Sequence, residues 1–224
     1  MRGYWGPVLA ILWKDLLLEA RNREVIVPVL LFAVLVVVVF NFAIEPRPAL
    51  VAVVAPGVLW LAFVFAGAMG LTRTFALEKE DGGVEGLMLC PVGRDVLYVG
   101  KMLGSLVFLL VVEALTLPVF AALFNLPIWQ PELWLLVVLA TIGLSAVGTA
   151  FSAMVANTRA REVLLPVLFF PILVPVIIAA VEATGAIIEG DAWGGYSRWL
   201  GLIAAFDAIF LVIGAITFDY VLGE

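Results

Sequence analysis

The chain has 224 residues, of which 65% are hydrophobic and 13% are charged. A soluble domain is about half apolar and a quarter charged, so this composition excludes an ordinary soluble domain and predicts a membrane protein. The net charge of −6 disfavours nucleic-acid binding, and the absence of histidine removes the most common imidazole ligand for a metal or haem iron. We therefore expect no metal site, and the single cysteine, Cys90, excludes an internal disulfide.

Residues 1–24 form the first of two expected units, a cytoplasmic helix at the membrane surface. Apolar and charged residues mix at helical spacing from Trp5 to Glu24, which is typical of a helix lying in the interface. We expect the apolar side to face lipid and the charged side to face water. The residues on the lipid side would be Val8, Leu12 and Leu16 with Leu9 and Trp13, and those on the water side Lys14, Asp15, Arg21 and Arg23.

Residues 25–224 form the second unit, an all-α transmembrane domain of six spans. Each apolar segment is close to the ~20 residues that a bilayer requires. The expected spans are 25–42, 49–71, 96–124, 132–156, 163–184 and 199–222. The fifth contains Pro166, Pro171 and Pro175, which predict either a kinked helix or a helix that ends near Pro175. We expect the second, with an outer segment over about 176–198.

The basic residues are divided unequally between the two sides of the membrane. One side carries Arg2, Lys14, Arg21, Arg23, Arg73, Lys79, Arg94, Lys101, Arg159 and Arg161, whereas the other carries Arg47 and Arg198. Because cytoplasmic loops are enriched in Lys and Arg, this bias places both termini in the cytoplasm. Five aromatic residues are expected at the outer ends of the spans: Trp129, Trp134, Trp193, Tyr196 and Trp199.

The polar stretch between the second and third spans has the features of a docking helix. Gly82 and Gly83 permit a sharp turn, and Val84, Leu87 and Met88 share one helical face before Pro91. The alternative is a solvated loop of mixed charge. We expect a soluble partner to contact Glu78, Glu80, Gly82, Gly83, Glu85, Leu87, Met88 and Pro91.

This stretch resembles the coupling helix of ABC-2-type exporter permeases, through Glu-Lys-Glu-x-Gly-x-x-Glu-x-Leu followed by Pro91 and Gly100-Lys101. The rest of the chain resembles the haem exporter protein B family, the CcmB family of cytochrome c maturation. That resemblance is carried by the segments 13–24, 57–62, 159–166, 174–184 and 204–207, which begin with Trp13-Lys14-Asp15-Leu16 and end with Ala-Ala-Phe-Asp207.

The resemblance implies a non-catalytic permease subunit of the bacterial inner membrane. It implies ATP on a partner ATPase of the CcmA type, haem as a possible substrate, and no cofactor bound by this chain. The sequence agrees that this chain lacks an ATP site, because Gly100-Lys101 is followed by Met102 and is preceded by Asp95 where a P-loop needs glycine. Further implied partners are a second copy of the chain and the haem-handling membrane proteins of the CcmC, CcmD and CcmE types.

Three acids lie within or near the spans: Glu113, Glu182 and Asp207. A charge at mid-membrane is costly, about 2.5–3.5 kcal/mol on insertion scales, so such residues are functional candidates. The sequence leaves two roles open for Glu113 and Asp207, hydrogen bonding at helix contacts or lining a substrate or proton path. Glu182 is expected near the outer surface, in solvent.

Small residues recur on one face of the fourth span and favour close helix packing: Thr141, Ser145, Gly148 and Ser152. Ala66 and Gly70 suggest the same for the second span.

The sequence is also compatible with three other functions. The first is an ABC-2 permease for another cargo, such as a polysaccharide or drug. The second is a proton-coupled secondary transporter that uses Glu113 and Asp207. The third is a passive scaffold for assembly.

Overall fold

A computed structural model describes residues 4–21, 23–44, 48–80, 93–126, 129–155 and 161–221, and every regular element within these ranges is an α-helix. Their apolar sequences give them this form, because only helices satisfy their own backbone hydrogen bonds one segment at a time in lipid. The helices are α1 (Trp5–Arg21), α2 (Arg23–Ala43), α3 (Pro48–Glu80), α5 (Arg94–Phe124), α6 (Pro131–Val155), α7 (Arg161–Glu189) and α8 (Trp193–Val221).

Six of these helices are long and apolar enough to cross a membrane, which confirms the expected all-α fold. The spans lie within α2, α3, α5, α6, α7 and α8, and the most apolar, Val25–Ala43, has a mean hydropathy of 3.0. The helix α3 is longer than its span. It continues from Thr72, the end of the apolar stretch, for eight further residues to Glu80, about 12 Å of helix.

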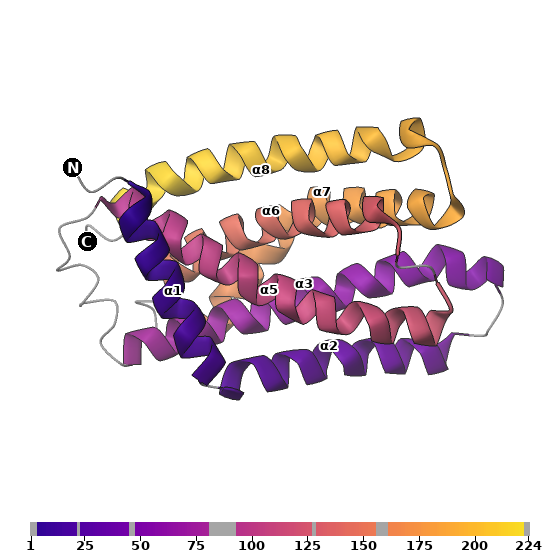
Figure 1. Ribbon diagram of the computed structural model, residues 1–224, viewed down its shortest axis with the longest axis horizontal. Coiled ribbons are helices and arrows are strands. Elements are labelled where there is room, and N and C mark those ends of the chain that lie inside the picture. The colour runs from indigo at the N-terminus through magenta and orange to yellow at the C-terminus, as the bar shows by residue number, and fades with distance from the viewer. Residues whose placement is uncertain are drawn as a thin grey trace.

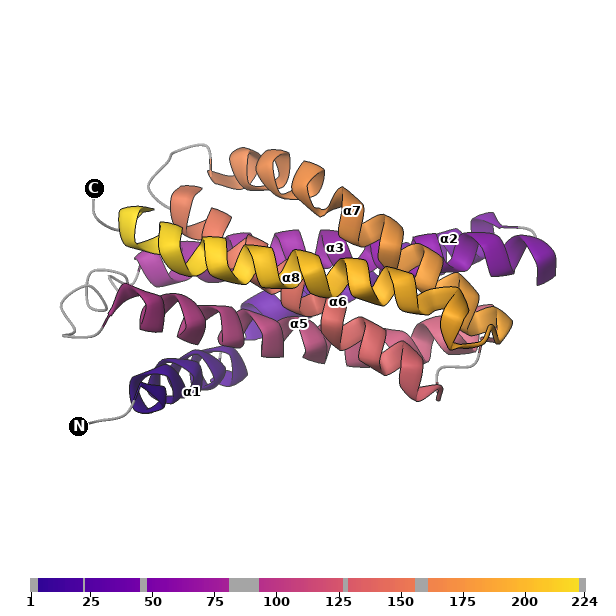
Figure 2. The ribbon, with the colours of Figure 1, turned by 90° about the horizontal axis from the view of Figure 1, so that it is seen from above.

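The spans run side by side along the long axis of the molecule, and α1 crosses them obliquely at one end (Figure 1). The same end holds the last turn of α3, the first turn of α5 and the end of α8 (Figures 1 and 2). An even number of spans returns the chain to the side on which it started. The architecture therefore brings α1, the α3–α5 boundary and the C-terminal end of α8 to one side of the domain.

Helix α6 lies at the centre and packs against α3, α5, α7 and α8. Its small residues allow this, and the predicted face is buried: Thr141, Ser145, Gly148 and Ser152. At Gly148 an added Cβ would overlap the Leu71 side chain and approach Phe169 within 3.2 Å. Gly70 on α3 is similarly covered by the Phe108 ring. The prediction that these residues serve close packing is therefore confirmed.

The expectation that the fifth span ends near Pro175 is wrong. Helix α7 continues through Pro166, Pro171 and Pro175 to Glu189, and Figure 2 shows it changing direction part-way along. The expected outer segment 176–198 is instead divided between the end of α7 and the start of α8. Proline removes one backbone donor and bends the helix, and membrane helices tolerate this where local adjustments satisfy the freed carbonyls.

The packing around α6 predicts a contrast between two glycine substitutions. Gly148→Ala is expected to destabilise the domain by about 1–3 kcal/mol, because the new methyl group overlaps the buried Leu71. Gly201→Ala on α8 is the matched control, since an added Cβ there meets nothing within 4 Å. Chemical unfolding of both variants in detergent measures the difference. Equal stability of the two would contradict the packing argument.

Candidate functional site

The predicted docking segment begins on the last turn of α3 and ends just before α5. Glu78 and Glu80 lie on α3, and Gly93 precedes the first residue of α5, Arg94. Gly82, Gly83, Glu85, Leu87, Met88 and Pro91 lie outside the described residues. The structure thus shows the two helices that flank the segment. Helix α3 ends and helix α5 begins on the same side of the domain (Figure 1).

Helix α1 packs directly onto α5 over two glycines one turn apart. An added Cβ at Gly100 would lie 2.9 Å from the Cβ of Ile11, and one at Gly104 would lie 3.1 Å from Oδ2 of Asp15. Both positions thus lack room for a side chain. The Gly-x-x-x-Gly spacing gives α5 a flat strip on which α1 rests.

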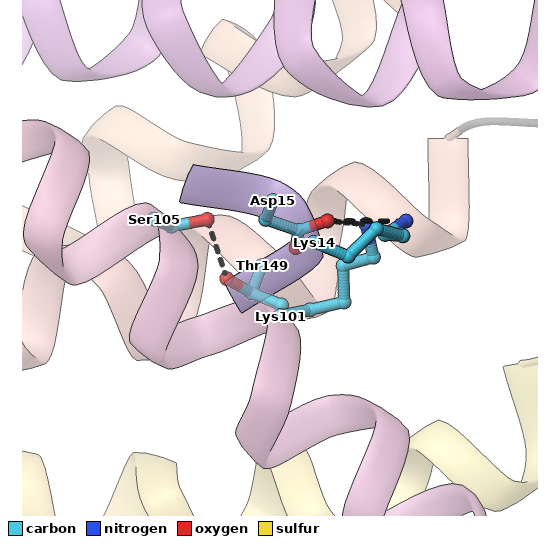
Figure 3. Close-up of polar contacts among 5 residues, drawn as sticks. All are labelled: Lys14, Asp15, Lys101, Ser105 and Thr149. Carbon is cyan, nitrogen blue, oxygen red and sulfur yellow. Dashed lines mark hydrogen bonds and ion pairs between the residues drawn. The ribbon is translucent and has the colours of Figure 1, made fainter. Parts of the chain in front are cut away.

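A buried ion pair fixes this crossing. The Nζ of Lys101 lies 3.1 Å from Oδ1 of Asp15, and the side chains are 7% and 13% exposed. Lys14 approaches the same oxygen at 3.1 Å but is 38% exposed. Figure 3 shows these groups together with Ser105 and Thr149, whose hydroxyl oxygens lie 3.4 Å apart. A lysine buried beside the start of a span needs such a carboxylate to offset its lost hydration.

The orientation of α1 differs from the expectation for Val8 and Asp15, whereas Leu9 and Trp13 face outward as expected. Val8 is fully buried against α5, and Asp15 points to Lys101 rather than to water. The outward face of α1 is apolar, and Trp13 on this face is 64% exposed. The other large exposed residues on or next to α1 are Tyr4, Trp5, Leu9, Leu17 and Leu18. Paired Trp and Leu side chains on a surface helix are typical of contact with the lipid interface. The helix therefore has two apolar faces, one on α5 and one outward.

Glu19 lies one turn beyond Asp15 and is partly buried. Burial raises its pKa to about 7, and the negative charge of Asp15 acts in the same direction. Its Oε1 accepts no hydrogen bond from the described residues. The protonated form of Glu19 is thus favoured where α1 is docked.

Buried polar side chains concentrate where α5 faces α6. Glu113 is 2% exposed, and its Oε2 lies 2.7 Å from the hydroxyl oxygen of Thr141. Towards the α1 end of the same interface, the hydroxyl oxygen of Ser145 lies 3.5 Å from the Sδ of Met102 and 2.9 Å from the carbonyl oxygen of Ile142. Tyr98 donates to the carbonyl oxygen of Ala146 at 3.1 Å. These contacts tie α5 to α6 along much of their length.

The other two candidate acids differ from Glu113. Asp207 lies at the middle of α8, 4% exposed, with its side chain against Gly143 of α6. Neither of its carboxyl oxygens has a hydrogen-bond partner among the described residues. Glu182 is exposed on α7. The structure therefore brings Glu113 and Asp207 to α6 and leaves Glu182 apart.

Sequence reasoning missed the crossing of α1 and α5. Asp15 and Lys101 were each assigned to the polar, cytoplasmic side, and the pairing of the two was not predicted. The signal that was present is Gly100-Lys101-Met102-Leu103-Gly104, a small-residue spacing that marks a close helix contact. Within the described ranges, no group of three Cys, Asp or Glu side chains is arranged to hold a metal ion.

Comparison with known proteins gives a consistent result over nearly the whole chain. The sequence profile of the family described as CcmB protein matches residues 7–222. Heme exporter protein B of Pseudomonas aeruginosa is 30% identical over 190 residues, which cover 84% of this chain and 85% of that protein. Heme exporter protein B of Rhodobacter capsulatus is 33% identical over 185 residues, 82% of this chain and 84% of that protein. The protein of the same name in Escherichia coli K12 is 28% identical over 202 residues, 88% and 91% of the two chains.

The buried ion pair predicts that Asp15 holds α1 in place. Asp15→Ala removes a carboxylate partner from a buried lysine, and the loss of a buried charge partner costs up to about 3–5 kcal/mol. We expect faster hydrogen exchange in α1 while the spans stay protected. Adding Lys101→Met, which removes the charge, should restore much of the protection. Lys14→Met is the control and should change little, because a half-exposed pair contributes about 0–1 kcal/mol.

The raised pKa of Glu19 predicts that docking of α1 weakens as pH rises. The protonated form of Glu19 is favoured in the docked state. The contribution of Glu19 to the stability of docked α1 is therefore full below pH 4.5 and is lost as pH rises through about 7. The distribution of distances between spin labels on the exposed faces of α1 and α5 should become broader as pH rises over this range. Glu19→Gln should abolish the broadening, and a wild-type distance that is constant from pH 4 to pH 8 would contradict the argument.

Proposed function

The chain belongs to the CcmB protein family, and from that membership we propose that it is the permease subunit of an ATP-driven complex that serves cytochrome c maturation. In this role it couples ATP hydrolysis by a partner ATPase to haem export or to release of a haem-loaded chaperone. The observation that carries the proposal is the extent of the similarity. The Pseudomonas aeruginosa and Rhodobacter capsulatus relatives named Heme exporter protein B match across more than four fifths of the chain, which includes parts on both sides of the docking stretch.

The proposed location is the bacterial inner membrane, with both termini in the cytoplasm. Six spans and the shared end of α1, α3, α5 and α8 support an arrangement with both chain ends on one side. The basic residues Lys14, Arg21, Arg94 and Lys101 belong to helices at that end, whereas Arg198 belongs to the start of α8 at the other. The positive-inside rule then assigns the α1 end to the cytoplasm.

The proposed ATPase contact is the segment 78–91. The extension of α3 beyond its apolar span supports this, because it carries the chain away from the hydrocarbon before the segment begins. Helix α5 starts directly after the segment and is tied to α1 by Lys101 and to α6 by Glu113. A displacement of the segment by an ATPase of the CcmA type would therefore reach α1 and the centre of the domain through one helix.

The proposed assembly contains two copies of this chain and two ATPases. One copy supplies six spans, and two nucleotide-binding subunits that close on each other need two docking segments. Haem-handling membrane proteins of the CcmC, CcmD and CcmE types would complete the complex. Haem is the proposed substrate of the complex, and ATP is bound by the partner.

One observation favours a second function, a proton-coupled secondary transporter. Glu113 and Asp207 are buried acids at mid-span, a placement that proton carriers share. Transport by the purified chain in vesicles with a pH gradient and without ATPase would favour this alternative. The same membrane permease acting on another cargo, a polysaccharide or drug, would be indicated if the purified complex lacked cytochrome c assembly proteins.

The docking proposal predicts the effect of charge reversal. The paired change Glu80→Lys and Glu85→Lys is expected to reduce the ATPase recovered with the chain by about tenfold, since like charges across an interface cost several kcal/mol. Glu189→Lys at the opposite end of the domain is the matched control and should leave recovery unchanged. Affinity purification of the complex measures both. Unaltered ATPase recovery and ATP turnover in the double variant would count against the docking role.

A further inference from the structure

Glu113 is enclosed near the middle of α5, and the apolar middle parts of the described helices that surround it carry no basic residue. Helix α5 packs against α1, α2, α3, α6 and α8. The spans Leu50–Thr72 of α3 and Val25–Ala43 of α2 contain no charged residue, and the only charge on α6 is Glu132, nine residues before Thr141. On α8 the charge at mid-span is another acid, Asp207.

The nearest basic residue on α5 itself is too distant to act as a counter-ion. Lys101 lies twelve residues before Glu113, about 18 Å along the helix, and pairs with Asp15 of α1. Helix α1 contacts α5 at Gly100 and Gly104, more than two turns from Glu113. An ionised carboxylate at this depth would therefore be desolvated and unpaired among the described residues, which is strongly unfavourable.

The hydrogen bonds of Thr141 point to the same protonation state. Its Oγ1 lies 2.6 Å from the carbonyl oxygen of Val137 and 2.7 Å from Oε2 of Glu113. A hydroxyl has one proton, so Thr141 cannot donate fully to both oxygens. If Thr141 donates to Val137, then the proton between Thr141 and Glu113 must come from the glutamic acid. Both short distances are then explained by one chain of hydrogen bonds.

We propose that Glu113 is held as a neutral carboxylic acid and donates a hydrogen bond to Thr141, which fastens α5 to α6 at the centre of the membrane domain. The proton stays on Glu113, Thr141 accepts from it, and the Thr141 hydroxyl donates to the Val137 carbonyl. The α5–α6 pair then moves as one body. Because α5 begins beside the docking segment, α6 and the helices packed on it follow any displacement of α5.

Infrared spectroscopy of the full chain in lipid tests the protonation state. The wild type should show the carbonyl band of a protonated carboxylic acid at neutral pH, and Glu113→Gln should remove one component of it. Asp207→Asn serves as the comparison, because it removes the other buried acid and should leave the Glu113 component in place. A Glu113→Gln difference spectrum that shows only loss of ionised carboxylate at neutral pH would overturn the proposal.

Substitutions test whether the hydrogen bond contributes to stability. The side-chain amide introduced by Glu113→Gln retains an N–H donor towards Thr141, so this variant should keep stability close to wild type. Glu113→Ala and Thr141→Val should each weaken the folded state by about 3- to 20-fold in the unfolding equilibrium, the range for interhelical hydrogen bonds in membranes. Thr116→Val is the matched control, since among the described residues the buried Thr116 hydroxyl bonds within α5, to the Val112 carbonyl at 2.8 Å.

A double-variant cycle separates this contact from general damage to the core. Glu113→Ala and Thr141→Val should be less than additive, because either change alone breaks the same bond. Full additivity, or a Glu113→Gln variant as unstable as Glu113→Ala, would show that the acid does not act as a donor to Thr141. The proposed haem-related function does not enter these measurements, so the two proposals fail independently.

Discussion

The arrangement of the domain depends on helix α6, which presents small side chains to four other helices. Without a hydrophobic driving force between helices in lipid, close contact and buried hydrogen bonds hold a bundle together. Because Gly148 has no side chain, Leu71 and Phe169 can pack against α6 at that point. Gly143 leaves room for Asp207 in the same way. Larger residues at these points would separate the helices and remove the contacts that the rest of the domain requires.

Glycines also permit close helix packing at the α1 end of the domain, where Gly100 and Gly104 let α1 lie directly on α5. There the two glycines are combined with the buried ion pair of Lys101 and Asp15, which fixes the point at which α1 crosses α5. Helix α5 is thereby held by α1 at one end and by α6 near its centre. Since α5 is also the first span after the proposed ATPase contact, its attachments define which parts of the domain a motor protein would move.

The sequence was sufficient for features that depend on local composition. Continuous apolar segments predicted the six spans, and the small-residue face of α6 was identified from its spacing alone. The rotation of α1 and the continuity of α7 were predicted wrongly, because each depends on tertiary contacts. Val8 and Trp13 are both apolar, and only the flat strip on α5 decides which of them is buried. In α7, prolines that would end a helix in water are retained as bends within the bundle.

The inferred Glu113–Thr141 bond limits where a substrate path could lie within the proposed complex. A path for haem between α5 and α6 would require that bond to break, which exposes a neutral acid and leaves Thr141 with one partner. Release of a haem-loaded chaperone needs only a displacement of the domain as a whole, and the bond can stay intact throughout. A fastening at the centre of the domain therefore argues against a haem path between α5 and α6 of one copy and is compatible with a movement in which these helices stay together.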